Sequence, residues 1–518
     1  MRWFLLFLSL IPLAHNDSNQ TGANTSEVLL SPANVTAAKF GKLGSYAVSG
    51  YIFAQPLFIP QATISGKLYD LLIIATLSNN VYAFDANRLN SIPLWHTSLG
   101  PTRTSYPGCC GGDLFFYSQG IGIVSTPVVD PVNNLLYVVN TNPTPSWVLS
   151  KLNLTTGAVI SSAAVSGQFP GTGAAGDPTS GGNLLFSPAQ ELQRPGLALG
   201  SGKVYIAFGG VGDVPPWHGW LFAYNTADLS QAGVFCTTPS SEGGAIWQGG
   251  GAPAIDAAGN VYITTGNDSG NTDPTEYGES VLKFSSTLAL LDWFTPSNDA
   301  TLDANDSDLS SNRPVLIPGS NLLIAAGKDF NVYVLNTGCM GHAQGSSGCP
   351  LQMFLSNPAG VAGDESGSYG VTLMNGTLFL PTTAGSIFAF TSAAGVFHAP
   401  AAASETNTYG FPGPAQMSGS SNGTASGILW ITTAAASSFT ATQPGTLRAL
   451  NVSTLTELWN SDTSGHDTPG SLSKYAAPTI ANGKVFVATQ DGQVKVFGLL
   501  SAVTVRGKVT VRGLVTIR

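Results

Sequence analysis

The five cysteines are the residues of this chain with the most distinctive chemistry. Cys109 and Cys110 are adjacent, Cys339 and Cys349 bracket a loop rich in glycine and serine, and Cys236 stands alone. In an oxidising compartment we expect Cys339 to pair with Cys349, and Cys236 to be a small buried hydrophobic residue. The chain contains no Cys-x-x-Cys-His motif, so the sequence predicts no covalently attached haem.

A second chemical feature is the densest acidic segment of the chain. It contains Asp299, Asp303, Asp306 and Asp308. The segment lacks the glycine and the terminal glutamate of an EF-hand loop, so we expect a solvated loop, with a calcium site as the alternative. Among six histidines, His218 lies in an aromatic-rich stretch, and we expect it to be a packed structural residue.

These residues are set in a repeated pattern of short strands. A hydrophobic stretch, a Gly/Asn/Asp turn, a second apolar strand and a further short strand recur about eight times. Repeats of about 40 to 60 residues that each supply four antiparallel strands predict a β-propeller. We expect an all-β fold with a single eight-bladed propeller, or seven blades if the copy at 372–390 is a distorted half-blade. The copies begin near Tyr51, Ile123, Pro195, Gly251, Pro314, Tyr369, Gly427 and Tyr475.

The two ends of the chain differ from the repeats. A positive charge, the apolar run 3–13 and Ala14 predict a signal peptide in residues 1–14, with a buried N-terminal strand as the alternative. Residues 15–43 are expected to form a polar linker, and residues 44–500 the propeller. Residues 501–518 form a basic repeat of six residues, which we expect to be a poorly ordered tail rather than an added strand.

The composition of the chain excludes some classes of function. Charged residues make up 9% of the chain, the net charge is −9, and the basic residues are scattered outside the tail, which excludes a nucleic-acid-binding face. The apolar run 3–13 is too short to span a bilayer, so we expect a secreted protein that is not membrane-spanning. Glycosylation sequons in the expected linker, at Asn16, Asn19, Asn24 and Asn34, are the ones we expect to be used.

Five stretches carry a resemblance to a known family. They are Arg194-Pro-Gly-Leu-Ala-Leu-Gly-Ser-Gly, Trp217-His-Gly-Trp, Gly244-Ala-Ile-Trp-Gln-Gly-Gly-Gly, Tyr262-Ile-Thr-Thr-Gly-Asn, and Trp293-Phe-Thr-Pro leading to Ala326-Gly-Lys-Asp. In this order they resemble the quinoprotein alcohol dehydrogenase type of propeller, between about residues 94 and 341. The similarity is closer to a mostly uncharacterised family of secreted proteins with pyrroloquinoline-quinone-type repeats.

The resemblance implies a set of site residues. In the dehydrogenases an adjacent cysteine pair forms a disulfide over the quinone, which implies this role for Cys109 and Cys110; the alternative is that one of them pairs with Cys236. Asn267 matches an asparagine that supplies a calcium oxygen. Asp213 is the acidic residue nearest to the position at which the dehydrogenases have their second calcium ligand, a carboxylate.

Lys328 matches the cation that contacts the quinone oxygens, with a surface lysine as the alternative. The chain departs from the family pattern at two places. The aromatic residue expected under the quinone falls at a glycine, with Trp247 a few residues early, and neither Asp299 nor Asp303 has the spacing of the catalytic base.

Two hypotheses follow. The first is a secreted quinoprotein-like protein that binds pyrroloquinoline quinone and calcium, as a weak or degenerate oxidoreductase. The second is a non-catalytic extracellular propeller that binds protein or glycan. The adjacent cysteines, Asn267 and Lys328 favour the first hypothesis, and the displaced base favours the second.

Overall fold

The computed structural model describes residues 9–106, 120–269, 275–344, 348–349, 351–356, 370–381, 386–399, 401, 403–405, 416–434 and 442–500. Cys109, Cys110 and the basic tail lie outside these residues. The described part consists almost entirely of short antiparallel strands, so the all-β prediction is confirmed. None of its helices is long and apolar enough to cross a membrane.

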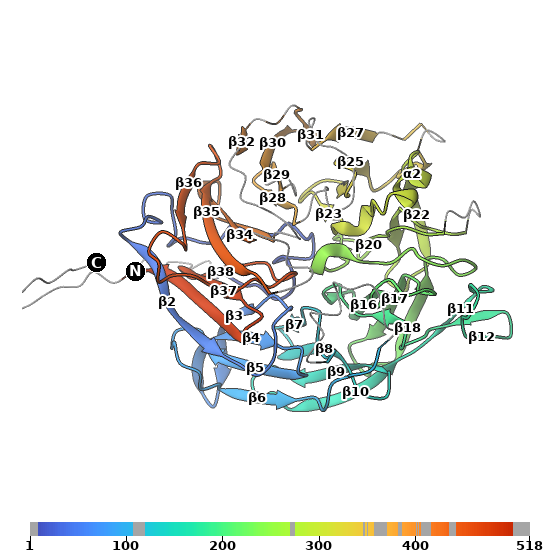
Figure 1. Ribbon diagram of the computed structural model, residues 1–518, viewed down its shortest axis with the longest axis horizontal. Coiled ribbons are helices and arrows are strands. Elements are labelled where there is room, and N and C mark those ends of the chain that lie inside the picture. The colour runs from blue at the N-terminus through green and yellow to red at the C-terminus, as the bar shows by residue number, and fades with distance from the viewer. Residues whose placement is uncertain are drawn as a thin grey trace, which may run out of the picture.

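Eight sheets, each with a run of four antiparallel strands, radiate around one axis (Figure 1), and we number them blades 1 to 8 along the chain. Blade 1 contains β3 (Leu57–Ile64), β4 (Lys67–Ala75), β5 (Asn80–Asp85) and β6 (Trp95–Ser98). Blade 2 contains β7 (Val128–Asp130), β8 (Leu135–Thr141), β9 (Trp147–Asn153) and β10 (Val159–Val165). Blade 3 contains β15 (Ala198–Gly200), β16 (Lys203–Gly210), β17 (Trp220–Asn225) and β18 (Gln231–Cys236). Blade 4 contains β19 (Ala254–Ile255), β20 (Val261–Thr264), β21 (Val281–Phe284) and β22 (Leu290–Thr295).

The second half of the ring repeats this arrangement. Blade 5 contains β23 (Val315–Leu316), β24 (Leu322–Ala326), β25 (Asn331–Asn336) and β27 (Leu351–Leu355). Blade 6 contains β28 (Thr372–Met374), β29 (Thr377–Pro381), β30 (Ile387–Ala393) and β32 (Ala403–Glu405). Blade 7 contains β33 (Met417–Asn422), β34 (Ala425–Ala434), β35 (Pro444–Asn451) and β36 (Glu457–Asn460). Blade 8 contains β38 (Thr479–Ala481), β39 (Lys484–Ala488), β40 (Gln493–Leu499) and β2 (Phe40–Ala47).

Shorter elements decorate the ring. A small sheet of β11 (Gln168–Pro170), β12 (Thr179–Ser180) and β13 (Asn183–Leu185) follows blade 2. Two-residue strands add to the blades: β1 (Ala23–Asn24), β14 (Glu191–Leu192), β26 (His342–Ala343), β31 (Val396–Phe397) and β37 (Gly470–Ser471). The helical elements are η1 (Gln248–Gly250), α2 (Asp299–Ala304) and η2 (Leu309–Ser311).

Burial along the strands explains the sequence pattern. The second strand of each blade is covered on both faces, so β16 is apolar almost throughout and only Lys203 is not fully buried. The outermost strand faces solvent on one side, and in β10 exposed residues occupy most of its length. Continuous apolar runs therefore mark inner strands, and polar residues mark the rim.

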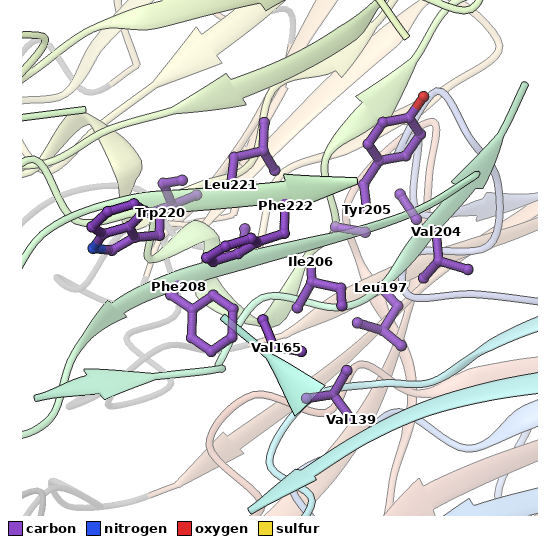
Figure 2. Close-up of a cluster of buried hydrophobic side chains, with 14 of the residues drawn as sticks. Val139, Val165, Leu197, Val204, Tyr205, Ile206, Phe208, Trp220, Leu221 and Phe222 are labelled. Carbon is purple, nitrogen blue, oxygen red and sulfur yellow. The ribbon is translucent and has the colours of Figure 1, made fainter. Parts of the chain in front are cut away.

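Hydrophobic clusters connect every blade to the next and close the ring. Trp220, Phe222 and Phe208 belong to a cluster that joins blades 2, 3 and 4 (Figure 2), and their rings pack edge-to-face or stacked. Further clusters join blades 4 and 5, 5 and 6, 6 and 7, 7 and 8, and 1 and 2. Another cluster joins blade 8 back to blade 1. No blade has to bury its faces alone.

The ring is closed by pairing the two ends of the described chain. The sequence analysis placed the propeller at 44–500 and residues 15–43 in a linker. The fourth strand of blade 8 is instead β2, which pairs with β40 from Phe40 to Ala47. One blade boundary also differs: blade 7 begins at Met417, and the predicted start at Gly427 falls within its second strand.

The segment predicted as a polar linker is packed into the protein. Asn16, Gln20, Asn24 and Glu27 are all buried, so residues 15–43 are not a free linker. Their polar side chains and carbonyls bond to the blades, which satisfies groups that a linker would leave to water. Asn16 and Asn24 therefore have no room for a glycan in the folded protein, and the secreted location remains a prediction.

The cysteine predictions that fall on described residues are confirmed. Cys339 and Cys349 form a disulfide. Cys236 is free and buried at the end of β18, and burial raises the pKa of its thiol.

The closing strand yields a stability prediction. Phe40 is fully buried and lies 4.9 Å from the Trp459 ring and 5.3 Å from the Trp430 ring. We expect Phe40→Ala to lower the free energy of unfolding by about 3–5 kcal/mol, because it leaves a cavity where the ring closes. Denaturant unfolding measures this, with exposed Val132→Ala as a control expected to cost under about 0.5 kcal/mol. Equal losses in the two variants would contradict the assigned closure.

Candidate functional site

Lys328, Asn267 and Asp308 lie together at the ends of strands in blades 4 and 5. Lys328, which follows β24, places its Nζ 2.7 Å from Oδ2 of Asp308 and 3.3 Å from Oδ1 of Asp306. The backbone N–H of Asn267, which follows β20, donates to Oδ1 of Asp308 over 3.2 Å. The Asp308 carboxylate is thus held between a cation and a backbone donor, and its side chain is only 7% exposed.

A glycine allows this approach. A Cβ built on Gly266 would lie 2.1 Å from Oδ1 of Asp308, which no side chain permits. The central position of the Thr-Gly-Asn strand end therefore requires glycine. Asn267 itself donates from Nδ2 to the carbonyl of Leu302, which turns its Oδ1 away from Leu302. This half-buried, bonded amide is a poor acceptor for a glycan.

A buried glutamate, Glu279, lies near Asp308 and holds the backbone of the next residue. Oε2 of Glu279 accepts a 2.6 Å hydrogen bond from the backbone of Leu309, and Oε1 is buried without a partner. Burial and the neighbouring Asp308 raise the pKa of Glu279 well above its usual range. Its φ of 42° lies in the left-handed region, where a glutamate is strained. Strain and an unpartnered acid together are typical of a functional site.

Asp303 lies at the edge of the same group. Burial is the main cause that raises its pKa to about 7, and the nearby carboxylates of Asp268, Asp299 and Asp308 add to the shift. Its Oδ1 accepts a 3.0 Å hydrogen bond from the backbone of Asp268. Asp303 and Asp308 are therefore not in the solvated loop expected from the sequence, because α2 and η2 fold them against the end of blade 4, whereas Asp306 is 65% exposed.

The turn at η1 reaches the axis. A Cβ on Gly250 would lie 2.7 Å from the carbonyl oxygen of Tyr475, although the two residues belong to blades 4 and 8 on opposite sides of the ring. Nε2 of Gln416, from blade 7, donates to the carbonyl of Gly249. Gln248, at the start of this turn, has a φ of 48°, is 1% exposed, and has no partner for either amide atom.

An aromatic and cationic stack adjoins this turn. The Arg194 guanidinium lies 4.4 Å from the centre of the Trp247 ring and 4.9 Å from that of Tyr475. Nη1 of Arg194 donates to the Tyr475 hydroxyl, and Nε donates to the Trp247 carbonyl. Lys474 is also buried, with its Nζ 5.2 Å from the Tyr475 ring. This end of the axis therefore carries buried positive charge.

The predicted site residues within the described part of the chain lie at three places. Lys328 and Asn267 both contact Asp308. Trp247 reaches the axial turn, but Arg194 covers its ring. Asp213 is exposed in the turn after β16, with a φ of 52°. Among the described residues no group of three or more His, Cys, Asp or Glu side chains could hold a metal ion, and Cys109 and Cys110 fall outside them.

Two residues were missed by the sequence analysis. Asp308 was placed in a solvated loop, and only Asp299 and Asp303 were compared with the catalytic base of the family. Gln248 was not singled out, because nothing in its sequence context reveals a left-handed buried amide. The Gly-Gly-Gly run that follows Gln248 is the one signal that an unusual turn occurs there.

His218 has a structural role, as expected. Its Nε2 lies 3.0 Å from Oδ2 of Asp177 and its Nδ1 lies 3.0 Å from the carbonyl oxygen of Thr238. The Thr238 hydroxyl donates to the Gly243 carbonyl, so both ring nitrogens of His218 face acceptors. This buried pair ties the loop before β12 to blade 3.

Comparison with known proteins agrees with this fold. No family model and no curated protein matches the chain. The quinohemoprotein alcohol dehydrogenase from Comamonas testosteroni superposes with a TM-score of 0.61 at 15% identity, over 98% of this chain and 83% of that one. Quinohemoprotein alcohol dehydrogenase ADHIIG from Pseudomonas putida HK5 gives 0.57 at 13% identity, over 98% and 82%. A europium-containing methanol dehydrogenase gives 0.57 at 11%, over 95% and 98%. The chain has the propeller fold of these quinoproteins.

The raised pKa of Asp303 predicts a pH effect. A carboxyl with a pKa of about 7 in the folded state and about 4 in the unfolded state binds more protons when folded, so stability falls as pH rises through this window. We expect Asp303→Asn to stabilise the protein at pH 8 by about 1–2 kcal/mol, after allowance for solvent screening, and to have little effect at pH 4. Urea unfolding at the two pH values measures this. An equal gain from Asp130→Asn, at the half-buried end of β7, would show a general charge effect instead.

Proposed function

We propose, from the propeller fold shared with quinoprotein dehydrogenases, that the axial end of this chain binds a small planar anion of the pyrroloquinoline quinone class. Oxidoreductase turnover on such a ligand is expected to be weak. The runner-up function is a non-catalytic propeller whose rim binds protein or glycan.

The observation that carries the proposal is Gln248. A buried amide without partners costs about 1–3 kcal/mol, and a left-handed backbone at a residue other than glycine adds to this cost. Gln490, at the end of β39 in the blade of Tyr475, is also buried with both amide atoms unpartnered. Polar groups left in this state at a propeller axis fit a polar ligand that completes their hydrogen bonds.

Charge at the site favours an anion. Half-buried Arg194 and buried Lys474 lie beside the same turn, and two cations side by side attract an anion. A planar compound with carboxylates and carbonyl oxygens would match the Arg194 guanidinium, the Lys474 ammonium and the Gln248 amide. Lys328, one blade from the turn, offers a further cation.

The chemistry available to the protein itself centres on Asp308. When bound, a quinone of this class supplies the acceptor for two electrons. Asp308 is the carboxylate placed to take a proton from a hydroxyl, with Lys328 as its counter-charge and Glu279 fixing the adjacent backbone. The alcohol that would donate this proton is not identified by the residues present.

Calcium is a weaker part of the proposal. Asn267 offers an amide oxygen, but Asp213 is exposed, and calcium needs six or more oxygens. The described residues do not assemble the predicted pair into a metal site. We therefore treat metal dependence as an outcome of the binding experiment.

Titration with pyrroloquinoline quinone tests the proposal. We expect the full chain to bind it with a dissociation constant of about 1–50 µM, read from the quinone absorbance and from tryptophan fluorescence, in buffers with calcium or with EDTA. Asparagine tolerates a left-handed φ, but its side chain is one methylene shorter than that of glutamine. Gln248→Asn should therefore weaken binding by about tenfold or more.

Gln61→Asn is a matched control, because Gln61 also has a positive φ, of 53°, but is exposed at the bulge within β3 of blade 1. It should leave binding unchanged. If the folded protein fails to bind at about 100 µM quinone, with and without calcium, the scaffold function replaces this proposal.

Catalysis is tested separately. With quinone, primary alcohols and an artificial electron acceptor, we expect turnover below about 1 per second, because Arg194 covers Trp247 and the metal ligands are not assembled. Any residual activity should fall at least about a hundredfold in Asp308→Asn, while quinone binding stays within about threefold. Turnover at the rates of ordinary enzymes would contradict the assignment as a weak oxidoreductase.

A further inference from the structure

Residues 11–24, which we call the axial segment, touch the blades one after another in chain order. The N–H of Ile11 donates to the Phe58 carbonyl of blade 1, and the Phe58 N–H donates back. The Val129 N–H of blade 2 donates to the Pro12 carbonyl. Ala14 then reaches blade 3, where a Cβ built on Gly196 would lie 2.8 Å from that of Ala14.

The same order continues through the second half of the ring. Backbone N–H groups at the first strands of blades 4, 5, 6 and 7 each donate to a carbonyl of the axial segment, over 2.8–2.9 Å. The four pairs are Ile255 to Ser18, Leu316 to Asn19, Leu373 to Thr21, and Gly419 to Gly22. The axial segment therefore makes one circuit of the ring.

Asn24 closes this circuit. Its Nδ2 donates to the Ile480 carbonyl of blade 8 and to Oγ of Ser9, both over 2.8 Å. Ser9 lies just before the contact with blade 1, so the start and the end of the circuit meet at one side chain. All eight blades are linked at their inner edges by a single stretch of chain.

These contacts satisfy donors that have few other options. The first strand of a blade has an unpaired inner edge, and its N–H groups are buried at the axis. Without the axial segment, each of them would lose a hydrogen bond at a cost of about 1–3 kcal/mol. The polar, irregular sequence of residues 15–24 suits this role, because a chain without regular secondary structure can direct each carbonyl to a different blade of the ring.

Removal of residues 1–14 is incompatible with this arrangement. Hydrolysis of the bond between Ala14 and His15 consumes one water and leaves a carboxylate on Ala14 and an ammonium on His15. The His15 backbone nitrogen is buried and donates to Oε1 of Gln55 over 2.9 Å, so the new charge would sit in the core. Ile11 and Leu13, which would be lost, are core residues of two hydrophobic clusters.

We infer that the axial segment is a permanent part of the folded protein, and that proteolytic processing of the N-terminus does not cut between Ser9 and Asn24. The apolar run that resembles a leader thus ends in core residues. This inference is independent of the proposed ligand.

Sequencing of the N-terminus tests the inference directly. The full-length reading frame is expressed in a host that secretes proteins, and the folded product is analysed by intact mass and N-terminal sequencing, both in the medium and in the cells. We expect every folded species to contain Ser9. A folded, monodisperse product that begins at His15 would overturn the inference.

Hydrogen exchange of the full chain gives a second test. In Asn24→Ala the circuit loses its closing side chain, and the amides of Leu373 and Gly419 should exchange at least about tenfold faster. Asn34→Ala is the control, since Asn34 bonds only to Leu29 and Ser31 nearby. If Asn24→Ala does not fold, Ser9→Ala removes a single bond of the same closure. Unchanged exchange at these amides in the folded variant would contradict the circuit.

Discussion

Each of the eight blades has two apolar faces in its inner strands, and neither face can be left in water. A sheet that is hydrophobic on both sides must be covered on both sides, and a ring of identical contacts is the arrangement that covers all of them at once. The clusters that join each blade to the next, including the one between blades 8 and 1, are the physical form of this constraint. It also explains why β2 comes from the N-terminal region: closure by strands from both ends of the chain prevents one interface from opening.

Closure of the ring creates a second problem at its centre. The first strand of each blade presents backbone donors toward the axis, and the axis is too enclosed for bulk water to serve all of them. The carbonyl groups of the axial segment accept hydrogen bonds from some of these backbone donors. The turn at Gln248 lies next to it, since the N–H of Ala252, two residues beyond Gly250, donates to Oε1 of Gln20. Here both side-chain amide atoms of Gln248 lack a hydrogen-bond partner, and this is the basis of the proposed ligand site.

The cluster of charged side chains at blades 4 and 5 also depends on ring closure. Lys328, Asp308 and Glu279 come from loops at one end of neighbouring blades, and only the stacking of these blades brings them within hydrogen-bond distance. Gly266 permits the contact because any side chain there would occupy the place of the carboxylate. Of the residues that the sequence resemblance singled out, Asn267 and Lys328 contact Asp308, whereas Arg194 lies over the Trp247 ring and Asp213 is exposed.

The sequence by itself determined the repeat, the all-β class and the strand ends that carry Asn267 and Lys328. These features depend on local patterns, namely alternating burial, turn residues and short apolar runs, which act over ten to twenty residues. Only the tertiary structure decided the role of Asp308, the strained amide of Gln248 and the path of residues 11–24. A polar stretch such as residues 15–24 has the composition of a linker, because carbonyls and amides that bond to distant strands leave no periodic mark. Whether such groups meet water or the inner edges of eight sheets depends on ring closure, which no local pattern encodes.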